Sequence, residues 1–185
     1  MPEKLVFEHT VEGLFVRGLV GRVTPALRER LKGVGVDLDR KLQPAYGFDT
    51  FCSAVRVAAR ELHPEVPEEV GYGLLGERMV DGYRETVLGR AAFGVIQLLG
   101  PRRALGRAQQ MFRSGNNYSE IRLADVLPTE VHLWMNEAGT LRYFTQGALL
   151  AGLRATGAHQ PQVAVQDFSE AHVTYRLTWR DGRGA

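Results

Sequence analysis

Side chains that could bind an anionic ligand gather mainly in one stretch, Phe112 to Arg122, which reads Phe-Arg-Ser-Gly-Asn-Asn-Tyr-Ser-Glu-Ile-Arg. Guanidinium groups form paired hydrogen bonds with carboxylates and phosphates, and asparagine and tyrosine add neutral hydrogen-bonding groups. We expect a ligand's anionic group to contact Arg107, Arg113, Asn116, Asn117, Tyr118 and Arg122. The structural alternative is that the arginines form a solvated helix face and the asparagines turn the backbone.

The sequence does not favour an enzyme, because no acid, base and nucleophile can be assembled into a set. It has no Gly-x-Ser-x-Gly elbow, and Gly71 to Gly76 matches a dinucleotide fingerprint only as a string, without its βαβ context. The five histidines lack metal-ligand spacing, and we interpret most of them as surface or strand-face residues. His132 and His172 could meet across a sheet. We predict no catalytic residue and no metal site.

The composition excludes further classes. The chain has 185 residues, 44% hydrophobic and 24% charged, which is typical of a globular protein. A net charge of +2 gives no case for nucleic-acid binding. The longest apolar stretch, Ala91 to Leu99, is far shorter than the roughly 20 residues that cross a bilayer, and no signal peptide is recognisable. With Cys52 as the single cysteine, we expect a cytoplasmic protein without a membrane span.

Residues 1–113 are predicted to be mainly helical. The near-alternation of apolar residues from Leu5 to Val16 predicts an extended N-terminal segment, such as an edge strand. Five helices are predicted. The first begins at Thr24-Pro25 and the second at Asp49 or Thr50, and the others run from Glu68 to Glu85, from Val87 to Leu99 and from Pro101 to Phe112. Each glycine inside a helix costs up to about 1 kcal/mol, so their density needs a reason. We favour close helix packing over a groove in which a ligand lies against bare backbone; the glycines are Gly71, Gly73, Gly76, Gly82, Gly89 and Gly94.

Residues 114–180 are predicted to form a sheet with one helix, and residues 181–185 a polar tail. Alternation predicts strands from Ile121 to Val126, Val131 to Met135, Gln162 to Phe168 and Ala171 to Trp179. The residues Asn136 to Gly139 are typical of a turn, and helical spacing of apolar residues predicts a helix from Tyr143 to Thr156. The expected fold class is α+β: one domain in which an N-terminal helical lobe packs on a C-terminal antiparallel sheet of order β-β-α-β-β.

Four segments carry a resemblance to a known family: Leu5 to Glu8, Asp37 to Asp39, Leu99 to Arg103 and Phe112 to Tyr118. Over almost its whole length the sequence looks like the myxobacterial paralogous family of unknown function. That resemblance implies no activity.

A second resemblance lies in Tyr143 to Leu149, Ala151 to Leu153 and Tyr175 to Trp179. Their layout is similar to vinyl-reductase-type, TRAPP-subunit and haem nitric-oxide/oxygen-binding domains, which implies a curved antiparallel sheet. The haem members need a histidine on the helix ahead of the sheet and a Tyr-x-Ser-x-Arg strand. Here Glu120 replaces the serine and no histidine lies between His63 and His132, so we expect neither haem nor another cofactor.

Two functions remain open. The first is a non-catalytic small-molecule-binding or sensory module, in which an apolar pocket lies between the helices and the inner sheet face and Arg113 to Arg122 form a polar mouth. A closed cavity beneath Tyr118 and Phe144 would favour this function. The second is a homodimeric interaction or scaffold protein without a ligand, as the TRAPP resemblance implies. An exposed apolar patch on Gly89 to Leu99 would favour the second.

Overall fold

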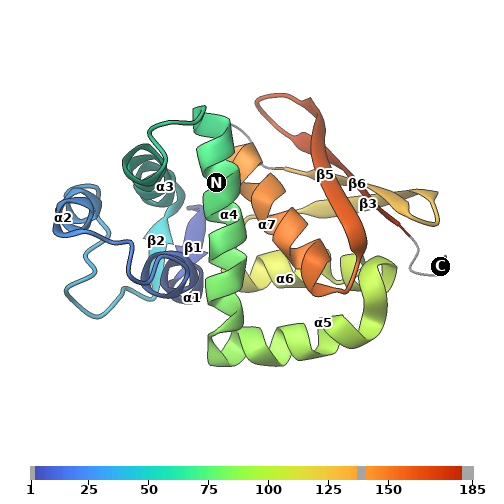
Figure 1. Ribbon diagram of the computed structural model, residues 1–185, viewed down its shortest axis with the longest axis horizontal. Coiled ribbons are helices and arrows are strands. Elements are labelled where there is room, and N and C mark those ends of the chain that lie inside the picture. Colours follow the sequence, from blue (N-terminus) through green and yellow to red (C-terminus); the bar gives the residue numbers. More distant parts are fainter. Residues whose placement is uncertain (1–2, 137–140, 181–185) are drawn as a thin grey trace.

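The computed structural model describes residues 3–136 and 141–180. Figure 1 shows a long helix, α4, through the middle of the molecule, with small helices and a short sheet on one side and α7 and a larger sheet on the other. The first part contains β1 (Leu5–Phe7), α1 (Glu8–Val11), the π-helix η1 (Glu12–Gly18), α2 (Pro25–Gly33), β2 (Ala45–Gly47), α3 (Phe48–Leu62), α4 (Glu68–Arg84), α5 (Val87–Leu105) and α6 (Ala108–Gly115). The predicted α+β class is confirmed.

The extended N-terminal segment was predicted too long. Only β1 is a strand, and it pairs with β2. The chain turns helical at Glu8, and Val11, Leu14 and Phe15 are buried. Their spacing of three and four residues places them on one face of a helix, and packing in the core selects that period over the alternation.

The other predicted helices are confirmed with small shifts in their ends. The Thr24 hydroxyl accepts a hydrogen bond from the Leu27 amide at 3.1 Å, as expected of an N-cap. Gly100, with a φ of +71°, kinks α5 before Pro101. The helix predicted to continue to Phe112 instead ends at Leu105, and α6 begins at Ala108.

The larger sheet follows the predicted order of elements. It contains β3 (Ile121–Leu127), β4 (Glu130–Met135), β5 (His159–Phe168) and β6 (Val173–Arg180), and α7 (Arg142–Ala155) connects β4 to β5. The strands are antiparallel in the order β3-β4-β6-β5. The buried inner face alternates as expected; it includes Val131, Leu133, Met135, Val173, Tyr175 and Leu177. The turn predicted over Asn136 to Gly139 lies partly, and the tail wholly, outside the described residues.

Close helix packing accounts for several of the glycines. A Cβ atom on Gly76 would overlap the carbonyl oxygen of Phe144 in α7, and one on Gly147 would overlap the carbonyl oxygen of Gly73 in α4. Gly82 approaches η1 in the same way, since its Cβ would overlap the carbonyl oxygen of Gly13. The backbones of α4, α7 and η1 therefore meet directly, so these glycines are packing residues and not the floor of a ligand groove.

One helix keeps an apolar face outside the core. The exposed apolar side chains of α5 are Val87, Leu88, Val95 and Leu98. No helix within residues 3–136 and 141–180 is both long and apolar enough to cross a membrane. Exposed apolar side chains gathered on one helix face are typical of surfaces that contact another protein.

Candidate functional site

An apolar cavity lies between the helical lobe and the sheet. Its walls come from α1, α4, α5, α6 and α7, and they include Met79, Phe93, Ile96, Met111, Phe144 and Leu153. The volume in which the centre of a water molecule can be placed is about 170 Å³. This is roughly ten times the volume that one water needs by the same measure. No Asp, Glu, Lys or Arg among the described residues lines it. An apolar ligand larger than a few waters therefore fits this environment.

His9 is the histidine that lines the cavity, and it comes from α1. Its Nε2 atom is buried and forms no hydrogen bond within the described part of the chain. A buried polar atom without a partner costs about 1–3 kcal/mol, and such atoms are rare in native structures. The centre of the imidazole ring lies 5.7 Å from that of Tyr83, which also lines the cavity. The cavity is thus lined by an imidazole whose Nε2 atom a ligand could engage.

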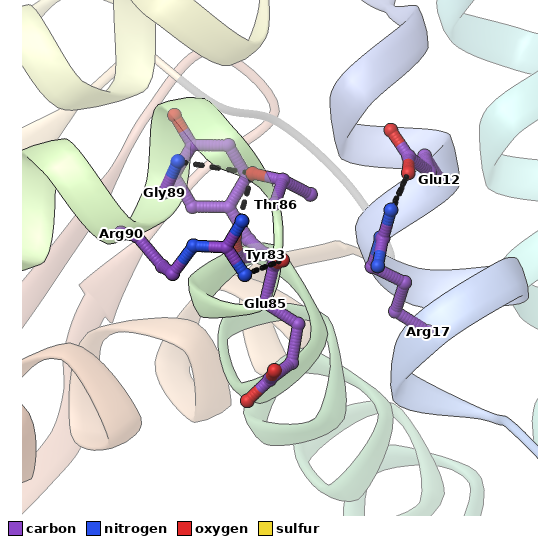
Figure 2. A network of polar contacts seen from close by, with 7 residues as sticks. All are labelled: Glu12, Arg17, Tyr83, Glu85, Thr86, Gly89 and Arg90. Atoms are coloured by element: carbon purple, nitrogen blue, oxygen red, sulfur yellow. Dashed lines mark hydrogen bonds and ion pairs between the residues drawn. The ribbon is translucent and has the colours of Figure 1, made fainter.

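The turn between α4 and α5 fixes the position of Tyr83 (Figure 2). The Thr86 hydroxyl donates to the Tyr83 carbonyl oxygen at 2.7 Å and accepts from the Gly89 amide at 2.9 Å. Arg90 donates to the Glu85 carbonyl oxygen at 3.0 Å. These bonds hold the end of α4, so the tyrosine ring is presented to the cavity from a rigid turn.

The polar rim of the cavity forms where α6 ends. The Oδ1 atom of Asn116 accepts hydrogen bonds from the amides of Tyr118 and Ser119, at 3.1 and 2.8 Å. Asn116, Tyr118 and Ser119 all line the cavity. The Thr10 hydroxyl donates to the Gly115 carbonyl oxygen at 3.1 Å, which ties α1 to this rim.

The remaining predicted site residues do not line the cavity. Asn117 accepts a hydrogen bond from the Leu5 amide at 2.8 Å and donates to the Glu3 carbonyl oxygen at 2.9 Å, so its side chain anchors the N-terminal strand. Arg113 donates to the Asn117 carbonyl oxygen at 2.5 Å. The Asn117 side chain therefore binds backbone groups of the N-terminal segment.

Arg107 and Arg122 lie away from Arg113. Arg107 is the exposed N-cap of α6. The guanidinium carbon of Arg122 lies 4.5 Å from the centre of the Trp134 ring, a cation–π contact. Side chains alternate along a strand, so Trp134 faces away from the cavity that Met135 lines. None of the predicted arginines lines the cavity.

Polar pairs on the sheet involve the other two histidines considered for a metal. His172 lies within 2.9 Å of the Ser169 hydroxyl and 3.2 Å of the Asp167 carboxylate, whereas His132 lies 3.3 Å from Glu130. Hydrogen bonds from Arg176 lower the pKa of Glu130. No group of three or more potential metal ligands occurs among the described residues. These contacts are ordinary cross-strand and turn pairs.

Solved structures share this fold. The chain is similar to an oxygen-binding H-NOX domain related to soluble guanylate cyclases, with a TM-score of 0.69, 11% identity and coverage of 94% of this chain and 92% of that one. It is also similar to an S. oneidensis H-NOX protein in the Fe(II)NO state, with a TM-score of 0.67, 11% identity and coverage of 95% and 99%. A third similar structure, whose title concerns haem redox potential and porphyrin distortion, has a TM-score of 0.70, 11% identity and coverage of 94% and 92%.

The fold is therefore H-NOX-like, as expected from the second resemblance. The chain belongs to the family described as "Protein of unknown function (DUF2378)", whose model matches residues 4–180. No curated protein matches it.

These comparisons contradict the prediction that haem is excluded and that no cofactor binds. That prediction searched for a histidine only on the helix ahead of the sheet and for a propionate-binding strand at Tyr118 to Arg122. In the structure Tyr118 to Glu120 precede β3, and His9 reaches the cavity from a segment that was predicted to be extended. Two features fit an iron porphyrin: apolar walls, and an imidazole nitrogen without a partner, since imidazole is a common axial ligand of haem iron.

The sequence contained a signal for the helix that carries His9, which the alternation obscured. Val11, Leu14, Phe15 and Gly18 follow helical spacing. On such a helix His9 lies on the face opposite to these residues, so the spacing indicates the helix but not a role for His9. Nothing in the local sequence shows that this turn faces α4 and α6 across the cavity.

Proposed function

We propose that the protein is a non-catalytic sensory module that binds an apolar small molecule in the cavity between its helical lobe and its sheet. The observation that carries the proposal is the apolar cavity lined by Tyr118 and Phe144, which also contains the unpartnered Nε2 atom of His9. An H-NOX-like fold supports it, because H-NOX proteins of known structure include oxygen and nitric oxide complexes.

An iron porphyrin is the ligand that the cavity fits best. When bound, it would supply an iron centre that takes up small gases. The apolar side chains would cover the faces of the ring, and Asn116, Ser119 and Tyr118 would contact its polar edge at the rim. Arg113 lies beside that rim through its bond to Asn117, where it could add positive charge for a carboxylate.

The test combines native mass spectrometry of the purified protein with a titration of iron(III) protoporphyrin. We expect a ligand carried through purification, or one porphyrin bound per chain with a Soret band. At a free ligand concentration of 100 times Kd, binding stabilises the fold by about 2.7 kcal/mol. That corresponds to a rise in Tm of roughly 5–10 °C for a chain of this size.

Filling the cavity supplies the decisive comparison. Gly152 lines the cavity, and a Cβ atom added there would meet nothing within 4 Å, so Gly152→Leu should occupy the space without distorting α7. Gly94→Leu is the matched control, because Gly94 also has open space but does not line the cavity. Binding should be lost in the first variant and kept in the second. Equal binding by both variants would contradict the proposed site.

A second candidate function, homodimeric interaction without a ligand, is favoured by the exposed apolar face of α5. Leu98 is 88% exposed and is the natural position at which to disrupt such an interface. Sedimentation equilibrium should show a dimer for the wild-type protein and a monomer for Leu98→Glu. Val20→Glu, at a position 77% exposed and far along the chain, is the control and should leave the dimer intact. A monomeric wild-type protein would exclude this candidate.

A further inference from the structure

We propose that His9 is the axial ligand of an iron porphyrin in the cavity, so that the iron is held from α1 and not from α6, the helix directly before the larger sheet. This inference rests on the proposed function and deepens it. Its starting point is the buried Nε2 atom of His9, which has no hydrogen-bond partner among the described residues. A neutral imidazole offers its unprotonated nitrogen as a lone pair to a metal ion.

The position of His9 satisfies the other needs of an axial ligand. Its ring lies among aromatic side chains, 5.7 Å from Tyr83 and 6.2 Å from Phe7 between ring centres, which limits its rotation. The residue that follows, Thr10, is bonded to the Gly115 carbonyl oxygen at the end of α6. The imidazole is thus carried on backbone that is tied to the end of α6, and a fixed ligand needs little reorganisation when iron binds.

The remaining histidines cannot compete for this role. His63, His132, His159 and His172 do not line the cavity. Of these, His132 and His172 already face carboxylates on the sheet.

Two other kinds of side chain in the cavity could reach an iron. The methionines that line it are Met79, Met111 and Met135, and the tyrosines are Tyr83 and Tyr118. Thioether sulfur and phenolate oxygen both serve as haem ligands in other proteins. The unpartnered nitrogen of His9 distinguishes it from these groups and makes it the first choice.

The experiment adds iron(III) protoporphyrin to the full-length wild-type protein and to the variants His9→Gln and His9→Ala. Glutamine keeps a side chain of similar length but does not replace imidazole as a strong iron ligand. Far-UV circular dichroism and melting curves establish that each variant is folded. The readout is the resonance Raman spectrum of the reduced complex together with the Soret maximum. His63→Ala is the control, because His63 is a partly buried histidine outside the cavity.

We expect an iron–histidine stretching band in wild type and His63→Ala, its loss in both His9 variants, and its return when free imidazole is added to His9→Ala. An iron–histidine band that persists in the His9 variants would overturn the inference and point to another histidine. A wild-type complex without that band would also overturn it and point to methionine or tyrosine. Wild type could instead bind no porphyrin but bind the dye anilinonaphthalene sulfonate, with dye binding lost in Gly152→Leu. That result would support the cavity as a binding site and refute His9 as an iron ligand. If neither the porphyrin nor the dye binds, the proposed function also falls.

Discussion

Replacing Gly76 by alanine should destabilise the protein, although alanine is the better helix former. The added methyl group would overlap the backbone carbonyl of Phe144, and the helices α4 and α7 would have to move apart. Overpacking of this kind costs typically 1–3 kcal/mol, and the upper end applies because backbone cannot rotate away as a side chain can. Alanine returns up to about 1 kcal/mol through helix propensity. The net loss should therefore be about 2 kcal/mol.

Gly94→Ala provides the matched control for this prediction. Gly94 lies inside α5, and an added Cβ atom meets nothing within 4 Å. Only the helix propensity term remains, so this variant should gain up to about 1 kcal/mol. The two variants should differ by about 3 kcal/mol with opposite signs relative to wild type.

Urea unfolding followed by circular dichroism measures both effects, with stability taken from the midpoint at constant m-value. For a chain of this size the Tm of Gly76→Ala should fall by roughly 4–8 °C, and that of Gly94→Ala should rise by roughly 2–4 °C. If Gly76→Ala is as stable as wild type or more so, the helices do not meet through backbone at this point. The ligand groove that we set aside would then regain support.

Three further predictions concern the rim and the pH dependence of stability. Asn117→Ala removes two hydrogen bonds to the N-terminal strand and should cost about 1–3 kcal/mol, whereas Arg113→Ala, at an exposed side chain, should change stability by less than about 0.5 kcal/mol in the same urea assay. Burial lowers the pKa of His63 below its ordinary value of 6.5. The contribution of the neutral imidazole to the free energy of unfolding is therefore complete above that pH and is lost as pH falls through the lowered pKa. His63→Gln should flatten this part of the Tm–pH curve, and an unchanged curve contradicts the assignment. The hydrogen bonds from Arg176 lower the pKa of Glu130, so their contribution to the free energy of unfolding is present above about pH 4.5 and is lost as pH falls through the lowered pKa. Arg176→Gln should remove the corresponding fall in Tm at acid pH.

Local signals were enough to predict the elements whose ends and faces depend on neighbouring residues. The Thr24-Pro25 start of α2 is an example, because an N-cap hydroxyl and a proline at the first helical position act within one turn. Strand β6 is another, since strict alternation leaves one face buried wherever the sheet packs. For similar reasons the order of elements along the chain, two strands, a helix and two strands, followed from the pattern.

The cavity could not be predicted in this way, because it depends on which distant segments meet. His9 lies on a turn that alternation made look extended, and packing of Val11 and Leu14 in the core decides the helix. The Arg107 and Arg122 side chains illustrate the converse. They are close in sequence to the rim, yet the start of a helix and the alternation of a strand point them elsewhere.

The stretch from Phe112 to Arg122 is physically connected to His9. Val6 and Asn116 form an isolated antiparallel bridge, and the amide of Asn117 bonds to the Leu5 carbonyl oxygen at 3.1 Å. With the bond from Thr10 to Gly115, these contacts fix the backbone on both sides of His9. The turn after α6 therefore contributes to the site in two ways: Asn116 and Tyr118 line its rim, and the backbone around them sets the position of the imidazole. It follows that Asn117→Ala should broaden the iron–histidine band of the porphyrin complex, although Asn117 does not touch the cavity. Arg113→Ala should leave that band unchanged, because it removes no contact to the N-terminal strand.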